Sequence, residues 1–126
     1  MAYRSSVTEL AEDAFARLVE RSIDAIPAPF AERLGSVAIV IEAEPTPGQL
    51  GRAGAVGLFG LYEGVPRTAY GASGAAYASK ITIFRGPLQR AFRDPQRLAA
   101  AVDDTVFHEV AHHFGISDAR LRELRR

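Results

Sequence analysis

Residues 107–118 read F-H-E-V-A-H-H-F-G-I-S-D and close a long segment in which apolar residues recur at helical spacing. On such a helix the rings of His108 and His112 project from one face, about one turn apart. Two imidazoles at that separation can chelate one metal ion, and zinc suits nitrogen and carboxylate ligands with a position left for water. The stretch therefore predicts a zinc site on a helix, with a hydrogen-bonded pair of core histidines as the alternative.

The glutamate between the two histidines has a separate role in this interpretation. Glu109 is rotated by about 100° from His108 on a helix, so it reaches the edge of the metal site without binding the ion. A general base that takes a proton from metal-bound water belongs at this place. A third protein ligand is still needed, and Asp118 is the candidate, because Gly115 allows the chain to turn sharply after the helix.

Other polar residues around the motif each allow two interpretations. His113 is rotated by about 100° from the second histidine, so we expect it to pack or to lie on the surface, with a contact to a metal ligand or substrate as the alternative. Asp104 lies one turn before His108 and could either orient that imidazole or be a solvated carboxylate. Three tyrosines could stabilise an oxyanion, although packing is their more common role: Tyr62, Tyr70 and Tyr77.

The hydrophobic pattern predicts helices and strands along the rest of the chain. A capping box at Ser6 and Glu9 starts a helix, which the I-P-A-P segment at 26–29 ends. Asp94 and Pro95 fit the N-cap and first position of the helix that carries the motif. The other predicted elements are strands at 36–43, 58–62 and 80–84, loops at 45–57 and 63–79, a helical turn at 87–92, and a last helix at 118–126 capped by Ser117.

Length and composition limit the possible classes of protein. The 126 residues predict a single domain spanning 1–126. Fifteen basic and fifteen acidic side chains give a net charge of zero, so no bulk field attracts nucleic acid or an anionic membrane. The absence of cysteine excludes disulfides and thiolate metal sites. With no signal-peptide pattern and no run of about 20 apolar residues, we expect a cytoplasmic monomer without a membrane span.

These motifs resemble a known family. The stretch H-E-V-A-H-H-F-G-I-S-D-A-R-L at 108–121, preceded by K-I-T-I-F-R-G-P-L at 80–88, is similar to the bacterial minimal zincin-like metallopeptidases. The resemblance implies an α+β fold with an N-terminal helix, a small mixed sheet, an active-site helix and a short C-terminal helix. It also implies that an extended substrate lies along an edge strand, for which K-I-T-I-F is the candidate. The family motif H-E-x-x-H-x-x-G-x-x-D maps onto His108, Glu109, His112, Gly115 and Asp118.

The sequence departs from the larger metzincins in ways that bear on its substrates. Its third ligand would be aspartate in place of histidine, and Met1 is its only methionine, so it has no Met-turn. Short or unfolded peptides are therefore the expected substrates of a zinc-dependent peptidase with Glu109 as its base. A zincin-like peptide-binding module with little turnover is one alternative. A metal-dependent endoribonuclease is another, because a bacterial rRNA-maturation family has similar histidine spacing; Glu109 and the neutral charge weigh against it.

Overall fold

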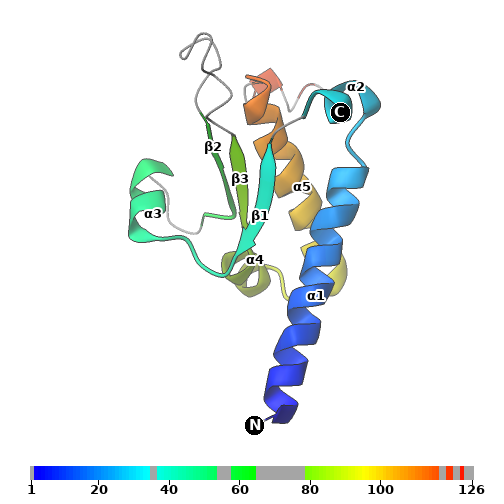
Figure 1. Cartoon of the computed structure of the whole chain (residues 1–126), viewed down its shortest axis with the longest axis vertical. Coiled ribbons are helices and arrows are strands. Elements are labelled where there is room, and N and C mark those ends of the chain that lie inside the picture. Colours follow the sequence, from blue (N-terminus) through cyan, green and yellow to red (C-terminus); the bar gives the residue numbers. More distant parts are fainter. Residues whose placement is uncertain are drawn as a thin grey trace.

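A computed structural model of the chain describes residues 2–34, 37–53, 58–64, 79–116, 119–120 and 123. A small mixed sheet packs with helices in this part of the chain, as Figure 1 shows, so the predicted α+β class is confirmed. The elements in chain order are α1 (Ala2–Asp24), α2 (Ala28–Leu34), β1 (Ala38–Glu42), α3 (Pro47–Ala53), β2 (Gly60–Glu63), β3 (Lys80–Phe84), α4 (Arg85–Ala91) and α5 (Pro95–His113).

The three strands lie in the order β1-β3-β2. Strand β3 is parallel to β1, with Ala38 opposite Lys80, and antiparallel to β2, with Gly60 opposite Ile83. K-I-T-I-F is therefore the central strand, and the expectation that it forms an edge is wrong. The physical reason is its burial: its last four residues are fully buried, and such a strand needs neighbours on both sides. Among the described residues, the edges of this sheet are β1 and β2.

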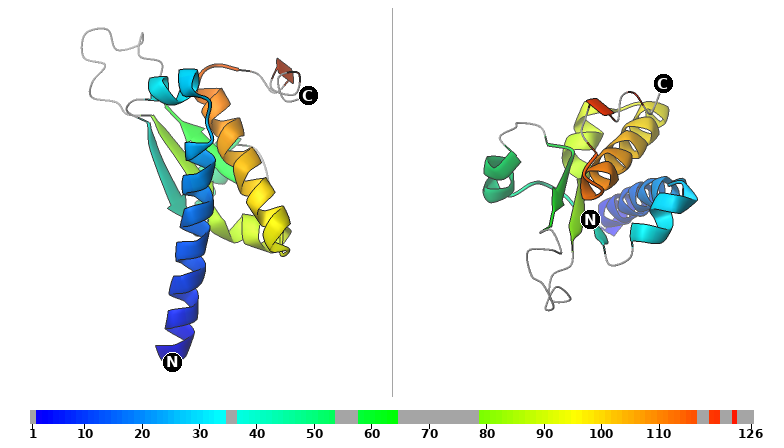
Figure 2. Two further views of the ribbon diagram at one scale, coloured as in Figure 1. Left: turned by 90° about the vertical axis from the view of Figure 1, so that its right-hand side faces the viewer. Right: turned by 90° about the horizontal axis from the view of Figure 1, so that it is seen from above.

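Helices α1 and α5 lie side by side on one face of the sheet, which is seen from above in Figure 2. Each is amphipathic and turns one apolar stripe toward the strands. Burial of each large aliphatic side chain stabilises the fold by roughly 1.5–3 kcal/mol. The core that these elements enclose includes Phe15 and Val19 from α1, Val102, Val106 and Val110 from α5, Ile81 and Ile83 from β3, and Leu88 from α4.

The N-terminal helical segment differs from its prediction at its start and in the helix that follows it. Helix α1 begins at Ala2, so Ser6 lies inside the helix and is not its N-cap. It ends at Asp24, before Pro27, as predicted, but a second helix, α2, follows at once. The carbonyl of Pro27 accepts hydrogen bonds from the amides of Phe30 and Ala31 at 3.0 and 2.9 Å. Pro29 lies in the first turn of α2. Proline is tolerated there because the backbone N–H that it lacks would have no partner within the helix.

Helix α3 lies in a segment that was predicted to be a loop. The amide of Thr46 donates to Gln49 Oε1 at 2.8 Å, and the amide of Gln49 donates to Thr46 Oγ1 at 3.1 Å. This is a reciprocal capping box, and Pro47 stands at the first helical position. The local T-P-G-Q signal thus outweighs the glycine- and proline-rich composition on which the loop prediction rested.

Both ends of α5 match the sequence signals. Asp94 is its N-cap and accepts a hydrogen bond from the amide of Arg97 at 3.0 Å. At the other end Gly115 has φ of +73°, its amide bonds to the carbonyl of His112 at 2.9 Å, and the amide of Ile116 bonds to the carbonyl of Ala111 at 2.9 Å. These two bonds form a Schellman motif.

The remaining predictions concern the segments around α5 and the C-terminus. Helix α4 starts directly after β3, two residues earlier than the predicted turn at 87–92. In the last predicted helix, residues 119–120 and 123 are helical; Ser117 and the other positions lie outside the described residues. Within the described part of the chain, no helix is both long and apolar enough to cross a membrane.

The N-cap of α5 gives a test of how far local signals stabilise the site-bearing helix. We expect Asp94→Ala to lower the free energy of unfolding by about 1 kcal/mol, because the first turn loses its side-chain acceptor. Asp94→Asn keeps an acceptor and should unfold like the wild type. Urea denaturation followed by circular dichroism measures both. Equal destabilisation by the two substitutions would contradict the capping role.

Candidate metal centre

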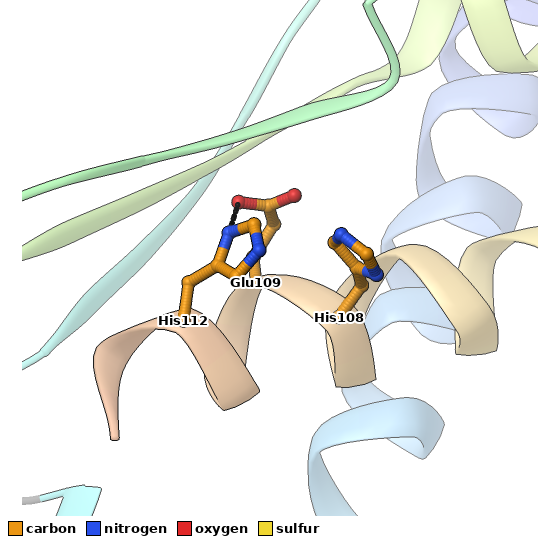
Figure 3. A group of neighbouring side chains, drawn as sticks. All are labelled: His108, Glu109 and His112. Carbon is orange, nitrogen blue, oxygen red and sulfur yellow. Dashed lines mark ion pairs between the residues drawn. The ribbon is translucent and has the colours of Figure 1, made fainter. Parts of the chain in front are cut away.

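Helix α5 brings three side chains with metal-binding atoms together near its C-terminal end, as Figure 3 shows. The ligand atoms of His108, Glu109 and His112 all lie within 4.8 Å of one another. The two imidazole rings are neighbours, with centroids 4.5 Å apart and planes tilted by 68°. The two histidines thus share one side of the helix, as their spacing predicts. The His112 side chain is 38% exposed, so this side is accessible from solvent.

The carboxylate of Glu109 is buried beside the two histidines. Its residue is only 7% exposed, and Oε1 lies 3.4 Å from Nδ1 of His112. Burial raises the pKa of this carboxyl, while the adjacent charges of His112 and His108 and hydrogen bonds from His112 and the backbone N–H of Tyr62 oppose the rise. The Glu109 carboxylate is therefore partly desolvated, is oriented by His112 and the backbone of Tyr62, and has a raised proton affinity.

The hydrogen bond from Tyr62 shows how β2 meets the site. The amide of Phe84 donates to the carbonyl of Phe59 at 2.8 Å, so this pair is a hydrogen-bonded pair of the antiparallel ladder. By alternation Gly60 and Tyr62 direct their backbone N–H and C=O groups away from β3. The outward N–H of Tyr62 is the donor to Glu109. The outer edge of β2 therefore borders the candidate metal centre.

Gly60 permits this close approach between β2 and α5. A Cβ atom at this position would lie 2.7 Å from Thr105 Cγ2 and 3.1 Å from Glu109 Cγ. Any side chain would push against the helix next to its buried carboxylate. A glycine inside a strand often marks such an approach, so the sequence did contain a signal for this contact.

His113 packs against β2 through the side chain of Tyr62. Its Nδ1 lies 3.1 Å from the hydroxyl of Tyr62, and the two rings meet edge to face with centroids 5.5 Å apart. The same hydroxyl lies 3.0 Å from Ser79 Oγ. The structure therefore gives His113 and Tyr62 a packing role that fastens the end of α5 to the sheet.

The remaining predicted residues have different outcomes. Asp118, Tyr70 and Tyr77 lie outside the described residues. Asp104 is exposed and lines the same hollow as His108 and Glu109. This hollow has a volume of about 360 Å³ and lies between α5 and the segment that leads into β2, where Leu58, Phe59 and Gly60 form its other wall. Sequence reasoning missed the role of that segment.

A helix that carries H-E-x-x-H, with both histidines on one side and next to a small mixed sheet, defines the zincin class of metalloprotein. The family model described as zincin-like metallopeptidase matches residues 34–126, nearly three quarters of the chain. The chain belongs to this family, which indicates a hydrolase that acts on peptides. A comparison with curated proteins gave no match.

The contact at Gly60 gives a test of the packing that surrounds the site. We expect Gly60→Ala to destabilise the protein by about 1–3 kcal/mol, because the added methyl overpacks Thr105 and Glu109. Gly51→Ala is the control: a Cβ there has nothing within 4 Å, and it lies in α3, where alanine is favoured. Thermal unfolding compares them. Similar stability of the two variants would argue against the close approach.

Proposed function

We propose that this chain is a zinc-dependent metallopeptidase in which His108, His112 and Asp118 hold the metal and Glu109 is the general base. The observation that carries the proposal is the buried Glu109 carboxylate, fixed by β2 and placed 3.4 Å from the ring of His112. A buried carboxylate costs free energy unless neighbouring groups compensate. Its retention beside two solvent-accessible imidazoles is consistent with a catalytic role.

The donor atoms present fit zinc. Two imidazoles within reach of one ion, with carboxylates nearby and no cysteine in the chain, are a common donor set for catalytic zinc. His112 turns Nδ1 toward Glu109, so Nε2 on the opposite side of the ring would hold the ion. The Schellman turn at Gly115 supports Asp118 as third ligand, because the chain changes direction three residues before it. When bound, zinc would polarise the scissile carbonyl and lower the pKa of its water.

Glu109 supplies the proton transfers in this mechanism. Its raised pKa makes the carboxylate a stronger proton acceptor, so it can take a proton as the water oxygen attacks the carbonyl carbon. The proton then passes to the amide nitrogen as the C–N bond breaks, which releases an amine and a carboxylate. The N–H of Tyr62 and the ring of His112 keep the Glu109 carboxylate oriented during both steps.

We place the substrate along the outer edge of β2, in place of the strand first expected. Gly60 turns its N–H and C=O outward there and Tyr62 its C=O, while the N–H of Tyr62 bonds to Glu109. An extended peptide can add to these outward groups of Gly60 and to the Tyr62 carbonyl by main-chain hydrogen bonds. The edge is short, since β2 has four residues, and the adjoining hollow opens to solvent. These features support short or unfolded peptides as substrates. We further propose that the protein acts as a monomer.

The assignment of Glu109 is tested by Glu109→Gln. We expect this variant to keep its zinc and to lose peptide hydrolysis by about 10²- to 10⁴-fold, because the proton acceptor is gone while the shape is kept. Asp94→Asn, remote from the site, is the matched control and should keep full activity. Cleavage of a fluorogenic peptide library by zinc-loaded protein gives the rates.

The outcomes of this assay separate the candidate functions. Wild-type activity that survives in Glu109→Gln rejects the assigned base. Saturable peptide binding by the wild type without any cleavage would instead favour a peptide-binding module. RNA cleavage at low salt, with no action on peptides, would favour the ribonuclease alternative.

The assignment of the metal ligands is tested by substituting two adjacent histidines, His112 and His113. We expect His112→Ala to lose most of its bound zinc, since one of three ligands is removed. His113→Ala should retain zinc, because its side chain contacts Tyr62 and does not belong to the group of metal-binding side chains found among the described residues. Elemental analysis of both purified proteins after zinc loading and gel filtration measures this difference. Equal zinc content in the two variants would reject His112 as a ligand.

A further inference from the structure

The hollow beside the metal centre continues along α5, away from the histidines. A second hollow of about 350 Å³ is lined by Phe59, Phe92, Arg97, Ala100, Ala101, Asp104 and Thr105. It shares Phe59, Asp104 and Thr105 with the hollow at His108 and Glu109, so the two adjoin as one groove along α5 from Glu109 back to Arg97. The groove therefore begins at the candidate catalytic residues and ends at Arg97.

The lining of this groove has an apolar wall, the acidic Asp104 in its middle and the basic Arg97 at its far end. Phe59 and Phe92 meet edge to face with centroids 5.7 Å apart and form one apolar wall. Small side chains of α5, Ala100 and Ala101, leave room opposite them. Arg97 stands at the far end with an exposed side chain. Such a surface suits an apolar side chain followed by an anion.

The direction of β2 determines which part of a peptide enters the groove. Gly60, at the start of β2, lies against Thr105, while Tyr62, two residues later, lies against His113. A peptide that pairs antiparallel with β2 therefore runs from the Tyr62 end toward the groove. Antiparallel pairing is the more stable arrangement per residue. The residues on the C-terminal side of the cleaved bond then occupy the groove.

The length of α5 gives the position of the anion. Arg97 precedes His108 by eleven residues, which is about 16 Å along a helix. An extended peptide advances about 3.3 Å per residue, so Arg97 lies opposite the fourth or fifth residue after the cleaved bond. Asp104 lines the middle of the groove, where its charge repels an acidic residue of the peptide.

We infer that this groove is the binding site for the C-terminal side of the substrate, with an apolar side chain against Phe59 and Phe92 and a carboxylate at Arg97. This inference rests on the proposed peptidase function and adds a substrate class to it. The carboxylate comes from the free C-terminus of a short peptide or from an acidic side chain at the same place. A guanidinium recognises both through the same paired hydrogen bonds.

Three peptides test the inference, all with apolar residues after the cleaved bond and five residues on that side. One ends in a free carboxylate with Gln as its last residue, one is the C-terminal amide of the same sequence, and one is an amide that ends in Glu. Binding to Glu109→Gln protein is measured by fluorescence anisotropy, and cleavage by the wild type gives kcat/KM. We expect the free acid to exceed the Gln amide by about two- to fivefold in both measurements, as suits one exposed ion pair.

Variants of two arginines identify the group that recognises the carboxylate. Arg97→Ala should remove the preference for the free acid, in binding and in kcat/KM, and Arg97→Lys should keep part of it. Arg93→Ala is the matched control, because Arg93 is an exposed arginine just before α5 that lines neither hollow. An increase in salt should weaken the preference in the wild type and leave Arg97→Ala unchanged.

Each outcome decides between the two proposals. Equal binding of acid and amide by the wild type, or a preference that survives in Arg97→Ala, overturns the groove assignment while peptide cleavage still supports the proposed function. Peptide binding with the expected preference but without cleavage supports the groove and rejects the peptidase. Absence of both binding and cleavage overturns both. If the Glu-ended amide and the free acid exceed the Gln amide equally in binding and kcat/KM, Arg97 recognises any carboxylate at this place. If only the free acid exceeds it, Arg97 recognises the terminal carboxylate.

Discussion

The contact between α5 and the edge of β2 is the constraint on which the rest of the structure depends. Gly60 lets the helix approach the strand until Thr105 and Glu109 take the space that a Cβ would fill, and the N–H of Tyr62 then reaches the Glu109 carboxylate. His113 fastens the same strand one turn further along. The helix carries the candidate metal centre, but the strand determines the orientation of its buried carboxylate. The geometry of the candidate site and the fold are therefore maintained by the same packing.

The features that sequence reasoning predicted well are those determined within a few residues. Asp94 and Gly115 carry the capping signals of α5, and the spacing of His108 and His112 depends only on helix geometry. The capping box of Thr46 was equally local, but the surrounding glycines and prolines received more weight. These successes and this error all concern short-range interactions, which a single sequence does encode.

The features that could not be predicted depend on residues distant in the chain. The central place of β3 follows from pairing with segments about 20 and 40 residues earlier, and nothing within K-I-T-I-F specifies its lateral neighbours. A strand pairs with its neighbours through backbone N–H and C=O groups, which are the same for every residue type except proline. The hydrogen bond to Glu109 could not be predicted for the same reason. Its donor is the backbone N–H of Tyr62, which the type of residue at this position does not reveal.

That main-chain donor has a consequence for how the protein can vary. Because the N–H that orients Glu109 is common to every residue except proline, no other substitution at position 62 deletes it outright. The side chain there instead serves the separate contact with His113 and Ser79. Tyr62 thus combines a main-chain hydrogen bond to Glu109 that is robust to mutation with a side-chain contact that is not. Most substitutions at this position would loosen the end of α5 and still keep the hydrogen bond to Glu109.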